Sequence, residues 1–115
     1  MTQSTTTKRR RRSDRNHILY LLTAPDGACY VGLTHVEGTP RKSLMRRWLK
    51  HINRAANEAH DWALCNSIRQ HGADSFRVEI IEKVRGKAAA HQREVMLIEH
   101  ISPALNTAKK KRAAA

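Results

Sequence analysis

Two short apolar runs joined by a turn sequence constrain the fold of this chain more than any other feature. The runs cover residues 17–22 and 29–34, and residues 24–27 between them read Ala-Pro-Asp-Gly. Proline and glycine at this spacing are typical of a turn between antiparallel strands, so the runs predict a β-hairpin. The first run is apolar at consecutive positions, which indicates a strand covered on both faces.

Helical spacing of apolar residues follows the predicted hairpin. Residues 41–59 are expected to form a helix with one apolar stripe. The stripe consists of Leu44, Met45, Trp48, Leu49, Ile52, Ala55 and Ala56. A second helix is expected to begin at an N-cap on Asp61 and to end at His71-Gly72.

The last third of the chain predicts one strand and one helix. Phe76, Val78 and Ile80 alternate with charged residues, which indicates a strand with one buried face. A helix is expected from about Lys87 to Ile101, ahead of Pro103. The order is ββααβα, an α/β (α+β) domain in which helices flank a small three-stranded antiparallel sheet.

Positive charge is concentrated at the two ends of the chain. Residues 1–15 carry six Lys and Arg against one Asp, and residues 109–115 carry four more, within a formal net charge of +12. We expect a disordered basic arm over residues 1–15, a folded domain over 16–106 and a disordered basic tail over 107–115. Such a charge balance favours a nucleic-acid partner, because neutralising phosphates releases condensed counterions. The basic residues expected to bind it are Arg9, Arg10, Arg11, Arg12, Lys50, Arg54, Lys109, Lys110 and Lys111.

The basic ends also fit a solubility tail, an anionic membrane surface or a nuclear import signal. We expect no membrane partner, because the ends lack an apolar anchor and no run approaches the roughly 20 apolar residues of a spanning helix. Cys29 and Cys65 have no partner motif and are expected to be buried thiols in a reducing compartment. The sequence has no nucleotide-binding glycine loop, no zinc-like spacing and no serine or cysteine nucleophile signature.

One carboxylate falls on the inward face of the last predicted helix. The neighbours of Glu94 at helical spacing are Ala90, Leu97, Ile98 and Ile101. Burying an unpaired carboxylate is costly, so Glu94 is expected to pair with an arginine, to stay neutral or to hold a cation. Glu99 falls on the opposite side and is expected to face solvent.

Arg47 and His51 lie four residues apart, on one flank of the stripe on the first predicted helix, and Arg54 continues that flank. An arginine there is either a surface residue whose stem covers apolar atoms or a phosphate clamp, since guanidinium matches two phosphate oxygens. Tyr20 and Tyr30 stand almost symmetrically about the turn and are expected close to a cross-strand pair, whereas a one-residue shift of the register would put them on opposite faces.

Taken together, these residues resemble the GIY-YIG nuclease family. Ile18-Leu19-Tyr20 corresponds to the first half-motif, with Ile-Leu in place of the leading Gly-Ile, and Tyr30-Val31-Gly32 keeps the second. Residues 47–51 (RWLKH) resemble the helix motif with its arginine and trailing histidine, and residues 64–72 resemble the second helix. Arg93-Glu94 and the ending Pro103-Ala104-Leu105-Asn106 resemble the metal-binding glutamate and terminal asparagine, so the resemblance covers roughly residues 17–106.

The resemblance implies cleavage of DNA at a single divalent-metal site, with Mg²⁺ or Mn²⁺ as cofactor. Glu94 would bind the metal, and Arg47 would bind the phosphate and stabilise the charge of the transition state. Tyr20 is favoured as the group that accepts the proton of the attacking water, Tyr30 would position water or phosphate, and His51 is a candidate for proton transfer. Gly32 and Asn106 are expected to have structural roles, Asn106 by tying the chain end to the sheet.

The main rival function is a catalytically inactive DNA-binding or architectural protein on the same fold. RNA is a less favoured substrate, because the chain lacks an aromatic stacking platform. No second DNA-reading motif is present, so intrinsic sequence specificity is expected to be low or supplied by a protein partner. The resemblance to small freestanding phage and bacterial members implies the cytoplasm of a bacterial or phage-infected cell, or the nucleus if the source is eukaryotic.

Overall fold

The computed structural model describes residues 15–58 and 62–106. Its strands are β1 (Asn16–Thr23), β2 (Cys29–His35) and β3 (Arg77–Arg85), and its helices are α2 (Pro40–Asn57), α3 (Ala63–His71) and α4 (Lys87–Ile101). The ββααβα order is therefore confirmed. Residues 1–14 of the expected arm and the tail at 107–115 lie outside the described residues. None of the helices described is both long and apolar enough to cross a membrane.

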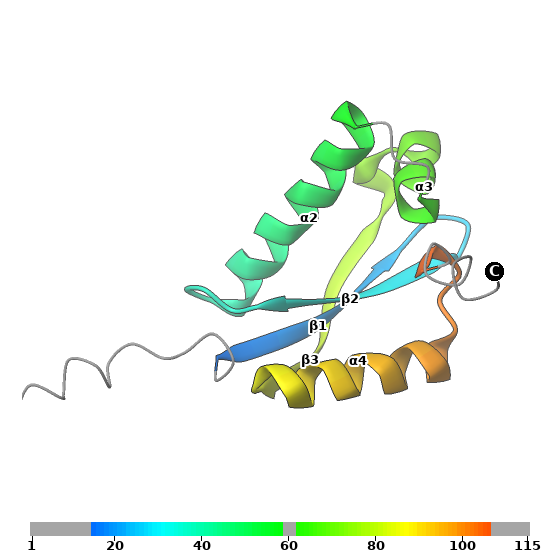
Figure 1. Ribbon diagram of the computed structural model, residues 1–115. Helices are drawn as coiled ribbons and strands as arrows, with labels where there is room; N and C mark the ends of the chain where they lie inside the picture. Colours follow the sequence, from blue (N-terminus) through cyan, green and yellow to red (C-terminus); the bar gives the residue numbers. More distant parts are fainter. Residues whose placement is uncertain (1–14, 59–61, 107–115) are drawn as a thin grey trace, which may run out of the picture.

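The three strands form one antiparallel sheet in the order β2-β1-β3, with β1 in the centre. Helices α2 and α3 lie on one face of this sheet and α4 lies on the other (Figure 1). Ile18 and Leu22 point towards α2 and α3, whereas Leu19 points to the opposite face, and all three are fully buried. The prediction of a first strand covered on both faces is thus confirmed.

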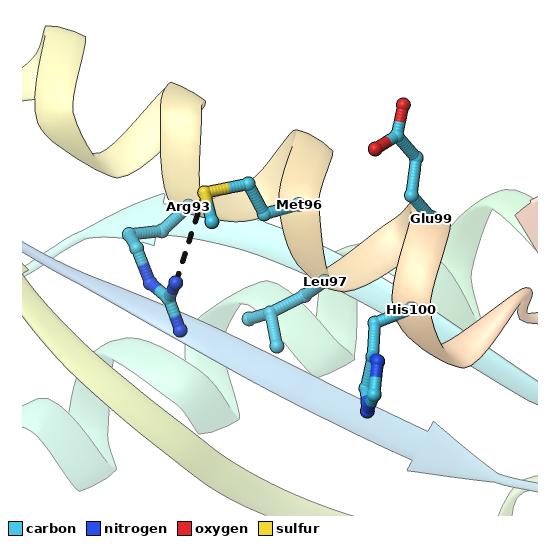
Figure 2. Close-up of a pocket in the computed structure, with 5 residues that line it drawn as sticks. All are labelled: Arg93, Met96, Leu97, Glu99 and His100. Atoms are coloured by element: carbon cyan, nitrogen blue, oxygen red, sulfur yellow. Dashed lines mark hydrogen bonds between the residues drawn. The ribbon is translucent and has the colours of Figure 1, made fainter.

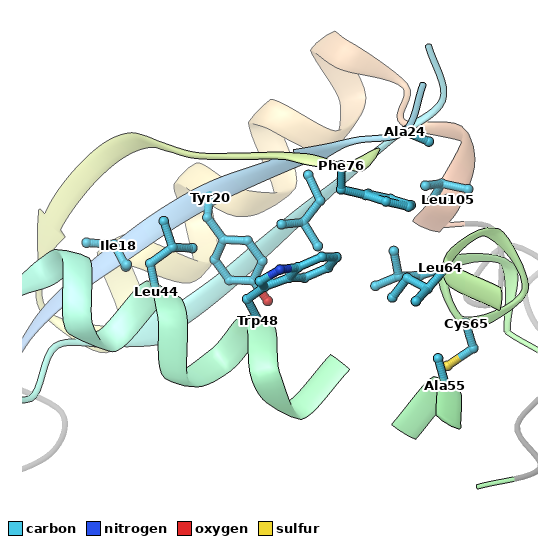
Figure 3. Packing of buried hydrophobic residues seen from close by; sticks show 12 residues of the cluster. Ile18, Tyr20, Ala24, Leu44, Trp48, Ala55, Leu64, Cys65, Phe76 and Leu105 are labelled. Atoms are coloured by element: carbon cyan, nitrogen blue, oxygen red, sulfur yellow. The ribbon is translucent and has the colours of Figure 1, made fainter. Parts of the chain in front are cut away.

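The larger core lies between the sheet and the α2–α3 layer (Figure 3). Trp48 of α2 packs against Phe76, with ring centroids 5.5 Å apart, and Leu64 of α3 and Leu105 complete this layer. Each such large apolar side chain contributes roughly 1.5–3 kcal/mol on burial. This core holds α2 against the sheet and so fixes the position of its polar side chains.

The face of α2 that is buried is rotated about the helix axis relative to the predicted apolar stripe. Met45 and Leu49 are 41% and 56% exposed, whereas His51 is buried. The buried residues of the helix are Ser43, Leu44, Trp48, His51 and Ala55. The helix is thus rotated about its axis towards the flank that carries His51, and burial of this side chain is possible because it hydrogen-bonds a tyrosine of the sheet.

Capping interactions set the ends of α2 and α3. Thr39 accepts a hydrogen bond from the Lys42 amide, so α2 begins slightly earlier than predicted. The N-cap residue of α3 is Trp62, and the predicted cap Asp61 lies outside the described residues. Gly72, with φ of 86°, ends α3 as predicted.

A β-bulge interrupts the pairing of β3 with β1. Leu19 pairs with Glu82 and Tyr20 pairs with Ile80, so Ile81 is an extra residue on β3. The bulge places Ile80 and Glu82 on opposite faces of the sheet, although two residues of a regular strand that far apart share a face. Glu82 therefore faces α4.

The predicted alternation of β3 is only partly correct. Phe76 is buried but precedes the strand, Val78 is half-buried, and Ile80 is 38% exposed. The face predicted to be buried is incomplete because β3 is an edge strand, with a neighbouring strand on one side only.

A bidentate ion pair connects the displaced Glu82 to α4. Arg93 Nε donates to Glu82 Oε2 at 2.8 Å, and Arg93 Nη2 donates to Oε1 at 2.9 Å. Figure 2 shows Arg93 and Leu97 pointing towards the sheet and Glu99 pointing away from it. The exposure expected of Glu99 is confirmed. The ion pair fixes the rotation of α4 and with it the direction of the adjacent Glu94.

Candidate active site

A cleft of about 410 Å³ lies along the edge strand β2. Its lining includes Tyr20 of β1, Tyr30 of β2, Arg47 of α2 and Glu94 of α4. Four of the five residues predicted to be catalytic therefore meet in one cleft, although they come from four different elements. The fifth, His51, contacts the cleft residue Tyr20.

The two tyrosines lie on the same face of the sheet as diagonal neighbours. Tyr20 stands opposite Gly32 and Tyr30 stands opposite Leu22, so they do not form a direct cross-strand pair. Their ring centroids are nevertheless 6.3 Å apart, which confirms the expected proximity.

Gly32 leaves the space through which the Tyr20 ring crosses β2. A Cβ atom at Gly32 would lie 2.3 Å from both Cζ and the hydroxyl oxygen of Tyr20. Tyr20 itself is 1% exposed, so its ring has little room to withdraw. The glycine of the second half-motif thus permits the close approach of the tyrosine of the first.

Tyr20 and His51 form a buried hydrogen bond of 2.9 Å between the hydroxyl oxygen and Nε2. Burial raises the pKa of Tyr20, as does the nearby Tyr30, although Arg47 opposes this rise. Burial, followed by the charges of Arg47 and Arg54, lowers the pKa of His51 to about 4. At neutral pH the phenol therefore keeps its proton and can donate it to an uncharged imidazole.

The low pKa of His51 predicts a loss of stability in acid. Between its usual pKa of 6.5 and about 4, the unfolded chain binds a proton at His51 that the folded chain does not bind. The free energy of unfolding should therefore fall as pH drops through this window, by up to about 3 kcal/mol from this group. Urea unfolding at several pH values should give a shallower pH dependence for His51→Gln. Equal pH dependence in the wild type and in His51→Gln would contradict the low pKa of His51. Burial also lowers the pKa of His17, so part of the pH dependence remains in both proteins.

Arg47 brings an unsatisfied donor to the cleft. Its side chain is half-buried, and its Nε is buried with no hydrogen-bond partner in the described part of the chain. A buried donor without a partner costs roughly 1–3 kcal/mol. Because Arg47 also lines the cleft, its guanidinium is placed where a phosphate could bind, which favours the phosphate clamp over a surface role.

Glu94 faces the cleft with its side chain 15% exposed. Its Oε1 lies 3.6 Å from Nδ1 of His91, and the neighbouring Arg93 pairs with Glu82 instead. The predicted alternative of a Glu94–arginine ion pair is therefore wrong for the described residues. Within residues 15–58 and 62–106, no group of three His, Cys, Asp or Glu side chains is placed to hold a metal ion. A metal at Glu94 would take its other ligands from water and substrate.

Asn106 ties the last described segment of the chain to the outer edge of β2. Its Oδ1 accepts a hydrogen bond from the Val31 amide at 2.9 Å, and its Nδ2 donates to the Val31 carbonyl at 3.0 Å. This side chain pairs with the strand as a further strand would, which is the tethering role expected of it.

The predicted DNA-binding residues of the domain lie on α2. Lys50 is exposed and lines a second pocket that adjoins the cleft, whereas the Arg54 guanidinium lies 5.8 Å from the centroid of the exposed Trp62 ring. The other predicted residues, Arg9–Arg12 and Lys109–Lys111, lie outside the described residues.

Several polar residues of the cleft were not predicted from the sequence. His17, His35, Lys87 and His91 line it beside the predicted residues. The signal for two of them is present in the sequence, because the register that places Tyr20 opposite Gly32 also places His17 opposite His35.

The prediction that both cysteines are buried is correct for only one of them. Cys65 is buried whereas Cys29 is only half-buried, and both are free thiols.

Comparison with known proteins finds no matching family model, no matching curated protein and no matching solved structure. Membership of the GIY-YIG family therefore stays a prediction. It rests on the motifs of the sequence and on the cleft in which their residues meet.

Proposed function

We propose that this protein is a GIY-YIG-type endonuclease that uses a divalent metal ion to hydrolyse phosphodiester bonds of DNA. The observation that carries the proposal is the convergence of Tyr20, Arg47 and Glu94 on one cleft. A protein that only binds DNA gains nothing from Glu94 there, because a carboxylate repels phosphate. Glu94 becomes useful when a cation stands between it and the phosphate.

The donor set of the cleft fits Mg²⁺ or Mn²⁺ held by Glu94. Magnesium prefers oxygen ligands and commonly keeps several waters, so one protein carboxylate together with substrate phosphate is a sufficient set. Sites with two metal ions use several carboxylates to hold both ions. Among the described residues that line the cleft, only Glu94 carries a carboxylate. When bound, the ion would supply positive charge beside the scissile phosphate.

Arg47 would bind the non-bridging oxygens of that phosphate. Its guanidinium lines the cleft, and its charge would stabilise the negative charge that builds up in the transition state. Because Arg47 also lowers the pKa of His51, phosphate binding would partly offset that effect and make the imidazole a better proton acceptor.

Tyr20 and His51 would together act as the general base. As water attacks phosphorus and the bond from phosphorus to the leaving oxygen breaks, the proton of the water would pass to the Tyr20 oxygen while the phenolic proton passes along the hydrogen bond to His51 Nε2. The leaving oxygen would take its proton from solvent. The phenol remains neutral and the imidazole ends protonated, so the high pKa of Tyr20 is no obstacle. Tyr30 would orient the attacking water or the phosphate from the same face of the sheet.

Conversion of supercoiled plasmid DNA to the nicked circular form tests the proposed activity. The protein should nick the plasmid in the presence of Mg²⁺ or Mn²⁺ and leave it intact in excess EDTA. An eluate prepared in parallel from cells without the gene controls for host nucleases. Binding of the plasmid without conversion under any of these metal conditions would favour the inactive DNA-binding protein instead.

Removal of the charged ends should weaken DNA binding without removing turnover. Residues 1–14 and 109–115 contain nine Lys and Arg, and the cleft residues lie elsewhere. The slope of log affinity against log salt changes by roughly 0.9 for each phosphate that the protein no longer neutralises, so the slope of the trimmed protein should be clearly shallower. At low salt and saturating DNA, its cleavage rate should match that of the full chain. An unchanged slope would instead favour an import signal or a protein partner as the role of the ends.

A further inference from the structure

A second, smaller pocket adjoins the cleft on its α2 side. It has a volume of about 150 Å³ and shares Thr34, His35 and Arg47 with the cleft. Arg46 and Lys50 contribute positive charge to it. The two hollows therefore meet at Arg47, and a DNA backbone bound at Arg47 would extend into the second pocket.

Three basic side chains of this region converge on one carboxylate, that of Glu37. Its Oε2 lies 3.5 Å from Arg15 Nη1 and 3.6 Å from His35 Nε2, and its Oε1 lies 3.4 Å from Arg46 Nη1. Arg15 directly precedes β1, His35 ends β2, and Arg46 lies in the first half of α2. Residues far apart in the sequence thus form a single basic cluster with Glu37 at its centre.

The contacts of Glu37 are loose. All three exceed the 2.8 and 2.9 Å of the Glu82–Arg93 pair in the same molecule, and the Glu37 side chain is 55% exposed. Arg15 Nη1 is buried and makes no hydrogen bond to any described residue. Exposed ion pairs of this kind contribute little stability, so the carboxylate can be displaced at small cost.

The backbone of Glu37 is held independently of its side chain. Its amide donates to Ser43 Oγ at 2.8 Å, and the Ser43 hydroxyl lies 3.1 Å from the Glu37 carbonyl oxygen. Ser43 is buried at the start of α2. The loop therefore keeps its place when the side chain moves or is replaced.

We propose that Arg15, His35 and Arg46 bind a second backbone phosphate of the DNA, and that the Glu37 carboxylate occupies this subsite in the free protein. The inference rests on the proposed function for its ligand, duplex DNA. A phosphodiester presents two oxygens that share one negative charge, as a carboxylate does, and the guanidinium groups suit both. Glu37 competes with the phosphate and lowers the affinity for DNA.

The affinity of three proteins for a short labelled duplex tests the subsite, with EDTA present so that no cleavage occurs. Glu37→Gln should bind about three- to ten-fold more tightly than the wild type, because the competing charge is gone. Glu99→Gln is the matched control, because it removes the same charge from an exposed carboxylate of α4. Glu99→Gln should bind within about two-fold of the wild type.

Arg46→Ala provides a second measurement. It should weaken binding by itself and should remove most of the gain from Glu37→Gln when the two are combined, because both act on one phosphate. The proposal is overturned if Glu37→Gln binds no more tightly than Glu99→Gln, or if its gain persists undiminished beside Arg46→Ala. If the wild type cleaves no DNA, the proposed nuclease activity is wrong. The affinities measured in EDTA still test the phosphate subsite, because they do not depend on cleavage. If none of these proteins binds DNA, both the nuclease proposal and the phosphate subsite are wrong.

Discussion

Glu94→Gln should abolish metal-dependent DNA cleavage and leave the affinity for duplex DNA unchanged or slightly higher. The amide has nearly the shape of the carboxylate but lacks the charge that would hold Mg²⁺ in the cleft. Metal ions contribute several kcal/mol to charge stabilisation in phosphoryl transfer, which corresponds to at least roughly a thousand-fold in rate. Affinity should not fall, because the substitution also removes a negative charge from beside the phosphate.

The nicking rate of supercoiled plasmid at saturating protein measures this effect, and Mn²⁺ titration in the presence of DNA provides a second readout. Glu99→Gln is again the control, because Glu99 lies on the same helix and points away from the sheet. It should leave both the rate and the Mn²⁺ affinity at wild-type values. A nicking rate near that of the wild type in Glu94→Gln would show that Glu94 is not the metal ligand.

Local spacing was enough to predict the parts of the site that depend on one element at a time. The inward direction of the Glu94 side chain follows from the helical period of α4, and the closeness of Tyr20 and Tyr30 follows from their near-symmetry about the turn. Their shared face depends on the strand register, which the sequence left open. The antiparallel sheet and the element order were also predictable, because each strand and helix carries its own pattern of apolar residues.

Features that depend on two distant elements were not predictable in this way. His51 is buried because Tyr20, 31 residues earlier, offers it a hydrogen bond, whereas polarity alone placed it on the flank of the stripe. The bulge at Ile81 is invisible in the sequence, yet it turns Glu82 towards Arg93. The cluster around Glu37 likewise joins three elements, and no local pattern indicates that they meet.

Gly32→Ala should destabilise the fold and disable the site together, through the Tyr20 ring. A methyl group at Gly32 would lie 2.3 Å from Cζ of Tyr20, far inside van der Waals contact, and the buried ring must shift to relieve the clash. Overpacking of this kind typically costs about 1–3 kcal/mol, a large part of the stability of a small domain. A shifted ring would also lose the 2.9 Å hydrogen bond to His51, so cleavage should fall even at temperatures where the variant stays folded.

A double-mutant cycle with Tyr20→Leu separates this clash from a general intolerance of alanine in β2. Leucine lacks the ring atoms that the new methyl group would meet, so in the Tyr20→Leu background Gly32→Ala should cost little. It should even stabilise slightly, because glycine weakens a strand interior by roughly 0.5–1 kcal/mol relative to alanine. Urea unfolding of the four proteins should therefore give a coupling free energy of about 2 kcal/mol between the two positions. If Gly32→Ala costs the same in both backgrounds, the crossing of the Tyr20 ring over Gly32 is not the reason for the glycine.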